Sequence, residues 1–170
     1  MITAELKRLC QEMGEYVILA EIHGESFVVV ADVQPDQSLR VQPKRHAPEN
    51  LHNMATLKVL LAYAPLPVQK TFLQKMTFRR MGPKAPRSST DYLRRLANIR
   101  REGRALCIDE VAVGIAALSV PVFDAGNRVV AAMGTSLPTA RLNTKRIPIL
   151  VNLLKQSAER IKNLNLITHP

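Results

Sequence analysis

The residues that could take part in chemistry are Cys107 and the adjacent acids Asp109 and Glu110. A thiol or hydroxyl becomes a nucleophile only where its pKa is lowered or a base activates it. Cys107 stands within the apolar run Ala-Leu-Cys-Ile, which favours a small core residue. Asp109 and Glu110 are adjacent, so on a strand they point to opposite faces and form a weak acid–base pair. Solvent-exposed charges at a strand end are the simpler interpretation of that pair.

Motifs that hold phosphates, metals or catalytic serines do not occur in this sequence. It contains no P-loop, no glycine-rich dinucleotide motif after a strand, no nucleophile elbow and no His-Glu-x-x-His. The four histidines are scattered, and His52, which precedes an apolar segment, is better interpreted as a packed or capping residue than as a base. We therefore expect no metal, no cofactor and no enzymatic activity.

The basic charge is concentrated in one segment. The 170 residues carry a net charge of +10, and residues 70–104 hold 11 Lys and Arg against two acids, Asp91 and Glu102. Such a segment could contact phosphates, with Phe78 stacking on a base. The chain is poor in aromatic residues, and no helix-turn-helix pattern is visible. A solvated or partner-facing surface is favoured over direct nucleic-acid binding.

Length and composition indicate one globular domain in a reducing compartment. The hydrophobic fraction of 46% excludes wholesale disorder. No apolar run approaches the roughly 20 residues of a membrane span, and the charged N-terminus does not resemble a signal peptide. Two distant cysteines form no disulfide framework. We expect a cytoplasmic protein without membrane association.

Periodicity predicts the elements that must position these side chains. In the first half we expect a helix at 3–13, strands at 16–22 and 26–33, a short strand at 39–42, and helices at 54–63 and 68–76. Asn53 is the expected N-cap of the second helix, and Lys58 is its only charge. That helix is apolar almost all round, which is typical of a helix buried against a sheet.

The second half predicts a helix, three strands and a long final helix. The helix begins at a Ser89 or Thr90 cap and ends at Gly103, and strands follow at 104–110, 115–123 and 129–135. Pro121 suggests a sheet edge or a bulge. Asn143 opens the final helix, which runs to about Leu164. Consecutive hairpins indicate an antiparallel sheet with helices packed on it, hence the α+β class.

Four collinear stretches resemble one protein family. Residues 51–62 (LHNMATLKVLLA) are similar to the LHATALGKALLA helix of IclR-type transcription regulators, and residues 90–109 to that family's helix, glycine and strand. Residues 110–124 (EVAVGIAALSVPVFD) resemble its E..pGv.ciAaPVfD element, and 129–141 its next strand. Each motif is weak alone, but the ordered set covers nearly the whole chain.

The resemblance implies a C-terminal effector-binding domain with a GAF-like or profilin-like fold, a curved antiparallel sheet with helices on its faces. Residues 1–170 would form this single domain, and residues 1–13 would be a remnant of a linker helix. The winged helix-turn-helix that binds operator DNA in full-length members would be absent from this chain. Members assemble as dimers or tetramers, so self-association is expected.

The family's pocket lies between the buried helix and the sheet. Carried over by position, it would be lined by Met54, Ala55, Thr56, Cys107, Glu110, Ile115, Ala117, Gly134 and Ser136, with Leu39 and Val41 closing it. Cys107 stands where acid-sensing members often have Asp, and Ala117 where Cys is common. Gly134 replaces a hydroxyl residue, and Leu57 replaces a helix glycine. A small carboxylate needs several charge-assisted donors to offset its desolvation.

These departures predict an effector that is less polar or larger than a simple keto acid, or a degenerate pocket without a ligand. The leading hypothesis is a small-molecule-sensing and oligomerisation module that modulates operator binding by the missing N-terminal domain. The alternative is a stand-alone small-molecule-binding protein, or an enzyme on the same scaffold using Glu110, Cys107 or Ser136.

Overall fold

The computed structural model describes residues 1–42 and 48–163. Its α-helices are α1 (Ile2–Met13), α2 (Ala55–Tyr63), α3 (Leu66–Lys75), α4 (Ser89–Glu102) and α5 (Arg146–Asn163). Its strands are β1 (Tyr16–His23), β2 (Ser26–Val33), β3 (Ala105–Ile108), β4 (Ile115–Phe123) and β5 (Val129–Pro138). Two short 3-10 helices, η1 (Pro48–Asn53) and η2 (Thr139–Arg141), complete the described elements.

The strands form one antiparallel sheet in the order β2-β1-β5-β4-β3. The two halves of the chain meet where β1 pairs with β5, with Tyr16 opposite Ser136. This is the α+β architecture that the hairpin pattern predicted.

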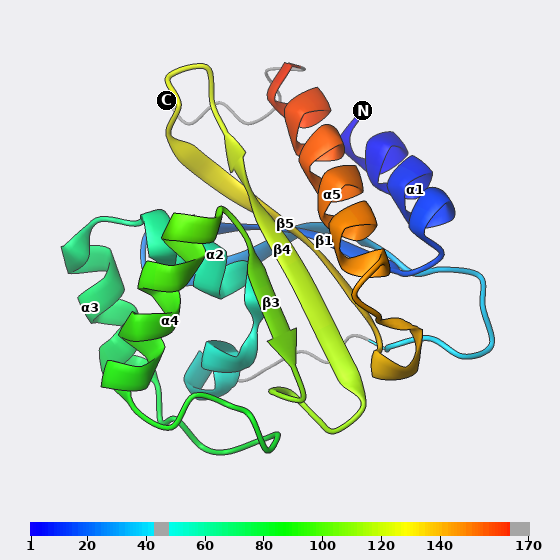
Figure 1. The fold of residues 1–170 in the computed structure, drawn as a ribbon. Helices are drawn as coiled ribbons and strands as arrows, with labels where there is room; N and C mark the ends of the chain where they lie inside the picture. Colours follow the sequence, from blue (N-terminus) through cyan, green and yellow to red (C-terminus); the bar gives the residue numbers. More distant parts are fainter. Residues whose placement is uncertain (43–47, 164–170) are drawn as a thin grey trace.

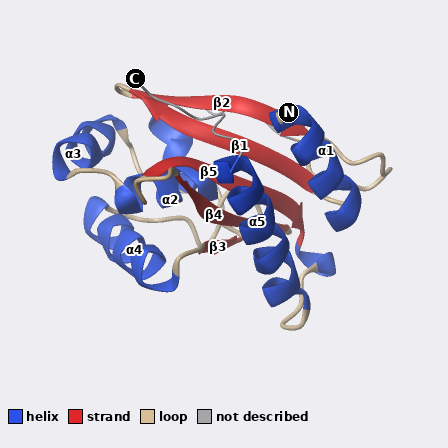
Figure 2. Ribbon diagram, turned by 90° about the horizontal axis from the view of Figure 1, so that it is seen from above, coloured by secondary structure: helices blue, strands red, loops and turns tan. Residues whose placement is uncertain are grey.

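Helices cover both faces of the sheet, so the domain has two cores (Figures 1 and 2). Helices α1 and α5 lie together on one face, where Leu9, Val120 and Leu154 are among the buried residues. Helices α2, α3 and α4 cover the other face, whose core includes Leu61, Phe72 and Tyr92. Since both faces are covered, the central strands are apolar on both sides, and six of the eight residues of β1 are buried.

Glycines end two of the helices, as predicted. Gly14 follows α1 and Gly103 follows α4, both in the left-handed conformation, with φ of 69° and 68°. The start of α4 differs by one residue from the prediction. Ser88, rather than Ser89 or Thr90, is the N-cap, because its Oγ accepts a hydrogen bond from the Asp91 backbone N–H at 3.2 Å.

Two predictions for the segment before α2 were wrong. No strand forms at 39–42: the chain bends at residues 38 and 39, and the Arg40 guanidinium donates to the Gln37 carbonyl of the same segment at 2.7 Å. Asn53 is not the N-cap of α2: it ends η1, its side chain is buried beside His52, and Met54 takes the cap position. Part of the neighbouring loop, residues 43–47, lies outside the described residues.

Pro121 and Pro148 lie at positions where the missing backbone N–H of proline is tolerated. Pro121 lies in β4, but β3 pairs only with residues 116–119, so Pro121 lies on a locally free edge of an inner strand, as predicted. Asn143 accepts backbone hydrogen bonds from Lys145 and Arg146, and α5 begins only at Arg146, two residues before Pro148.

Candidate functional site

The sheet places five of the predicted site residues on one face. Cys107 is opposite Ala117, Ala117 is opposite Ser136, and Ile115 and Gly134 follow two positions along their strands. Residues directly opposite each other, and residues two apart on one strand, point to the same face. This is the face that α2, α3 and α4 cover.

Helix α2 lies directly against this face. A Cβ added at Gly134 would meet Thr56 Cγ2 at 2.9 Å, so the glycine permits the close approach of α2 to β5. Ala55 and Thr56 are buried at this contact, Met54 is half-buried beside it, and Leu57 is wholly buried in the core.

The predicted site divides into an inner and an outer part. Ala55, Thr56, Cys107, Glu110 and Gly134 are buried, whereas Met54, Ile115, Ala117, Ser136 and Val41 are half-buried. Leu39 is 66% exposed, and its backbone carbonyl accepts a hydrogen bond from Arg141 at 3.0 Å. The outer part is therefore the more solvent-exposed side of the predicted site.

A buried ion pair lies at the inner end. The Lys58 side chain is 1% exposed; its Nζ forms an ion pair with Glu110 and donates to Cys107 Sγ at 3.3 Å. The prediction that Glu110 is a solvent-exposed charge at a strand end is thus wrong. The chain turns after β3 and directs this carboxylate inward. Asp109 takes φ 56° in that turn and accepts from the Gly114 N–H at 2.9 Å.

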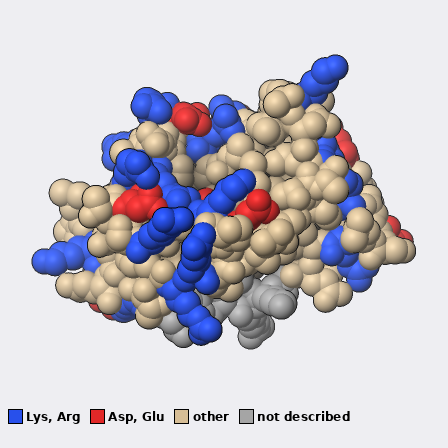
Figure 3. All heavy atoms as spheres, turned by 60° about the horizontal axis from the view of Figure 1, so that its bottom comes forward, with Lys and Arg blue, Asp and Glu red and all other residues tan. Residues whose placement is uncertain are grey.

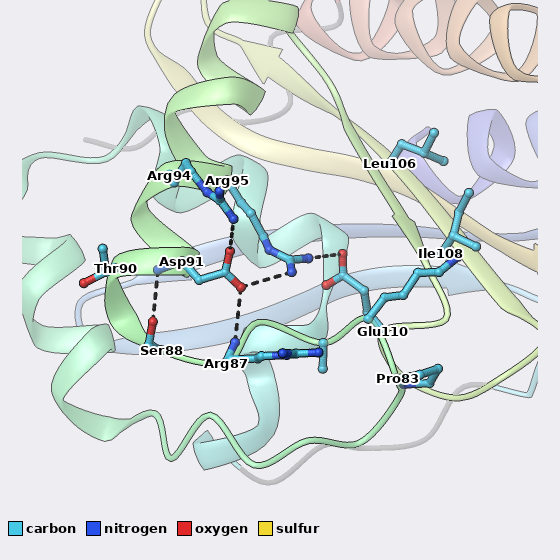
Figure 4. A pocket seen from close by; sticks show the side chains of 12 residues that line it. Pro83, Arg87, Ser88, Thr90, Asp91, Arg94, Arg95, Leu106, Ile108 and Glu110 are labelled. Carbon is cyan, nitrogen blue, oxygen red and sulfur yellow. Dashed lines mark hydrogen bonds and ion pairs between the residues drawn. The ribbon is translucent and has the colours of Figure 1, made fainter.

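The ion pair continues outward as a series of alternating charges (Figure 4). Arg95 donates to Glu110 at 2.9 Å and to Asp91 at 3.1 Å, and Arg94 donates to Asp91 at 2.7 Å. Burial alone would raise the pKa of Asp91, but the hydrogen bonds from Arg95, Arg94 and the Arg87 backbone N–H lower it to about 2. The series joins the core to the surface through α4.

Cys107 is not built as a nucleophile. Burial raises the pKa of its thiol to about 11, against the opposing effect of Lys58. Tyr92 is fully buried, and burial raises the pKa of its hydroxyl well above the usual value. The nearby Cys107 and Glu110 raise it further. The Tyr92 hydroxyl has no hydrogen-bond partner among the described residues. The site thus offers one unused hydroxyl and a protonated thiol.

Sequence reasoning missed Lys58, Arg95, Asp91 and Tyr92 as site residues. The signal for Lys58 was present, since a lone lysine in a helix that is apolar on every side must be paired when buried. Its partner could not be named, because Glu110 lies 52 positions away. Arg95 belongs to the basic segment 70–104, which was interpreted as a solvated or partner-facing surface.

The basic segment forms a groove at the outer edge of β3. The groove has a volume of about 890 Å³ and is bounded by the 83–88 loop, the first turns of α4 and β3, with Lys84, Arg87 and Arg94 among its cations. Figure 3 shows Lys and Arg side chains gathered around a few carboxylates on this face. Of the predicted site residues, only Glu110 lines this groove.

Two other kinds of feature, a metal cluster and a membrane-spanning helix, are absent from the described part of the chain. Within it, no cluster of three or more His, Cys, Asp or Glu side chains is arranged to hold a metal ion. None of its helices combines the length and the apolar character that crossing a bilayer requires.

Comparison with known proteins identifies relatives along nearly the whole chain. Residues 2–163 match the family model of the bacterial transcriptional regulator IclR C-terminal domain. The Pca operon regulatory protein of Acinetobacter baylyi is 30% identical over 145 residues, covering 82% of this chain and 52% of that protein. The chain spans about half the length of the curated relatives it matches, and those relatives are transcriptional regulators rather than enzymes.

Solved structures show the same fold. The C-terminal domain of Escherichia coli KdgR aligns with a TM-score of 0.78 at 23% identity, covering 95% of this chain and 94% of that one. A double mutant of the Acinetobacter PobR inducer-binding domain, in complex with 3-hydroxybenzoic acid, aligns with a TM-score of 0.79 at 26% identity, covering 95% of each chain. The chain belongs to the family of C-terminal domains of IclR-type bacterial transcriptional regulators.

Proposed function

We propose that this domain binds a small-molecule effector on the sheet face beneath α2. Operator binding would then be modulated through an N-terminal DNA-binding domain outside these 170 residues. The observation that carries the proposal is the convergence of Cys107, Ala117 and Ser136 in one row under α2, with a buried inner end and a half-buried outer end. Deep, mostly apolar sites with a few polar groups are typical of small-molecule pockets.

The polar groups of the site favour an effector with one polar end and an apolar body. The Lys58 ammonium is already paired with Glu110, so it does not offer a free cation for a carboxylate. Ser136 and the unused Tyr92 hydroxyl supply neutral hydrogen bonds. A keto acid small enough to be all polar would lose more hydration than these groups return, whereas burial of an apolar body would offset the desolvation of the one carboxylate of a larger acid. We therefore propose an effector larger or less polar than pyruvate or glyoxylate.

The related PobR domain supports this chemical class, since its structure holds 3-hydroxybenzoic acid. We propose a population shift as the mode of action: the effector binds one arrangement of the assembled regulator better than another. Self-association of this domain as a dimer or tetramer would couple those arrangements between subunits. A regulator of this kind acts in the cytoplasm.

A thermal-shift screen tests the proposal. The panel contains pyruvate, glyoxylate, 3-hydroxybenzoate, 4-hydroxybenzoate, phenylacetate and longer aliphatic acids. A ligand at about 100 times its dissociation constant stabilises the native state by about 2.7 kcal/mol. We expect stabilisation by an aromatic or longer acid and none by pyruvate or glyoxylate. Binding of pyruvate or glyoxylate at micromolar concentration would overturn the proposed effector class.

Tyr92→Phe is the matched variant, because it removes only a hydroxyl that has no partner among the described residues. We expect the variant to fold with unchanged or slightly higher stability, since no hydrogen bond is lost. The stabilisation by the effector should fall. Equal stabilisation of both proteins would place the ligand away from the inner end of the site.

A further inference from the structure

We propose that the groove at the outer edge of β3 docks an extended acidic segment of a partner protein, which adds to the sheet as a further strand. The proposal concerns a surface outside the effector site and does not depend on it. Two properties of the groove carry it: an open strand edge on one side and an excess of cationic over anionic side chains on the other.

The strand edge is open at two residues. Across the β3–β4 pair, the Asp109 N–H donates to the Ile115 carbonyl at 2.9 Å. Backbone groups of successive strand residues point to alternate sides, so those of Leu106 and Ile108 point away from β4. These same two residues line the groove, and Figure 4 shows their side chains along β3. Their N–H and C=O groups are therefore available to an added strand.

The edge is already paired immediately beyond β3. The Gly82 N–H donates to the Glu110 carbonyl at 2.9 Å, and the Lys84 N–H donates to the Asp109 carbonyl at 3.1 Å. The 82–84 segment thus runs along residues 109–110 and stops at the C-terminal end of β3, next to Ile108. An incoming segment would continue this pairing along Leu106 and Ile108.

The opposite wall supplies the charge. The Arg87 guanidinium has no ion pair or hydrogen bond among the described residues. Arg94 pairs with Asp91 but its side chain is 75% exposed, and Lys84, 3.4 Å from Asp109, is 63% exposed. The carboxylates within the groove, Asp91 and Glu110, are both already bonded to Arg95. The charge left for a partner is therefore positive.

An extended acidic peptide satisfies all of these groups together. Its backbone can bond with Leu106 and Ile108, its acidic side chains can reach Arg87 and Arg94, and alternate apolar side chains can rest on Leu106 and Ile108. A free small anion or a nucleic acid would use the cations but leave the strand edge unpaired. A second copy of this chain would bring its own arginines to the same place, which like-charge repulsion disfavours.

The test uses the full chain and a fluorescent nine-residue peptide of alternating Glu and Val, at low salt. The same peptide with alternate backbone nitrogens methylated keeps the charge but cannot form the ladder. The groove variant is Arg87→Glu with Arg94→Glu. The control is Lys70→Glu with Arg101→Glu, two exposed cations outside the groove that change the net charge equally. A nine-residue oligothymidine tests the nucleic-acid alternative.

We expect the groove variant to weaken peptide binding at least tenfold and the control variant less than twofold. Methylation should also weaken binding at least tenfold, and the amides of Leu106 and Ile108 should exchange more slowly in the complex. Absence of peptide binding, equal loss in both variants, or unchanged binding of the methylated peptide would overturn the proposal. Tighter binding of oligothymidine with the same dependence on Arg87 and Arg94 would instead assign the groove to nucleic acid.

Discussion

At the residue scale, the Lys58–Glu110 pair is the most consequential contact of the site. Two opposite charges are held almost without solvent, and neither can lose its partner without leaving a buried charge. Glu110 also accepts from Arg95, whereas among the described residues Lys58 has only the Cys107 sulfur besides Glu110. Loss of Glu110 therefore leaves Lys58 without a negatively charged partner in the described part of the chain, whereas loss of Lys58 leaves Glu110 still paired with Arg95.

We predict that Glu110→Gln destabilises the fold more than Lys58→Met. Removing one partner of a buried pair costs about 3–5 kcal/mol, and Arg95 can still neutralise Glu110 when Lys58 is lost. The double variant should be less destabilised than the sum of the two single variants. Urea unfolding of the four proteins measures this difference. Strict additivity would show that the pair is not coupled.

The residues that sequence could and could not assign differ in a physical way. Cys107, Ala117 and Ser136 were assigned to one site by position, from the resemblance to the family's pocket, and the strand register places the three in one row. Lys58 and Glu110 could not be paired, because their contact arises only when α2 packs on the sheet. Local patterns indicate which face a side chain takes, but not which distant charge it meets.

At the element scale, the first turn of α4 depends on one hydroxyl. Ser88 accepts from the Asp91 N–H, whereas Ser89 is already within the helix. We predict that Ser88→Ala costs about 1 kcal/mol of unfolding free energy. Ser89→Ala, the matched control, should change it by less than half of that. Equal effects in thermal unfolding would contradict the assignment of the cap.

The contact of α2 with β5 depends on Gly134. We predict that Gly134→Ala destabilises the domain by about 1–3 kcal/mol, because the new methyl group would lie too close to Thr56 Cγ2 and the Leu118 carbonyl. Thr56→Ser removes the Cγ2 methyl and should relieve part of the cost. Calorimetric unfolding of the single and double variants checks this, and a neutral Gly134→Ala would mean that α2 is free to move away.

Most elements could be predicted from periodicity, and the errors have local causes. The helices, hairpins and closing glycines Gly14 and Gly103 follow from short-range rules. The strand expected at 39–42 does not form, since the chain bends at residues 38 and 39 and Arg40 bonds to the Gln37 carbonyl within that segment. The α4 cap was misplaced by one residue, since Ser88, Ser89 and Thr90 carry the same capping group and only geometry selects between them.

At the scale of the whole molecule, acidic side chains tie separate elements together. Glu5 on α1 accepts from Ser157 on α5 at 2.6 Å and pairs with Arg160 at 3.3 Å. Burial would raise the pKa of Glu5, but the hydrogen bonds from Arg8, Ser157 and Arg160 lower it to about 2. Asp91 behaves in the same way on the opposite face of the sheet.

We predict that the domain loses stability as the pH falls from about 4 towards 2. In the unfolded chain these carboxyls titrate near 3.9–4.3, so they bind protons more readily than in the folded state. Their contribution is complete above that range and is lost below it, about 1–2 kcal/mol each after allowance for partial exposure. Urea unfolding between pH 2 and pH 6 measures the slope. Glu5→Gln and Asp91→Asn should each flatten it, and an unchanged slope would contradict the assignment.

Part of the net charge of +10 lies around the groove beside β3. Partition of the charge indicated a solvated or partner-facing surface, and the fold concentrates part of that segment around one groove. Composition could not separate Arg95, which bridges Asp91 and Glu110, from Arg94, whose side chain is 75% exposed, or from Arg87. That distinction arises only from the way α4 packs beside β3.

The central claim is that an effector binds on the sheet face beneath α2. Ala117 is half-buried in the middle of the proposed site, so Ala117→Phe should fill the space while the fold remains. The decisive measurement is calorimetric titration of the wild type and Ala117→Phe with the strongest stabiliser among the aromatic and longer acids, and with pyruvate. We predict micromolar binding to the wild type, at least tenfold weaker binding to the variant, and no binding of pyruvate. Equal binding to both proteins, or micromolar binding of pyruvate, would contradict the claim.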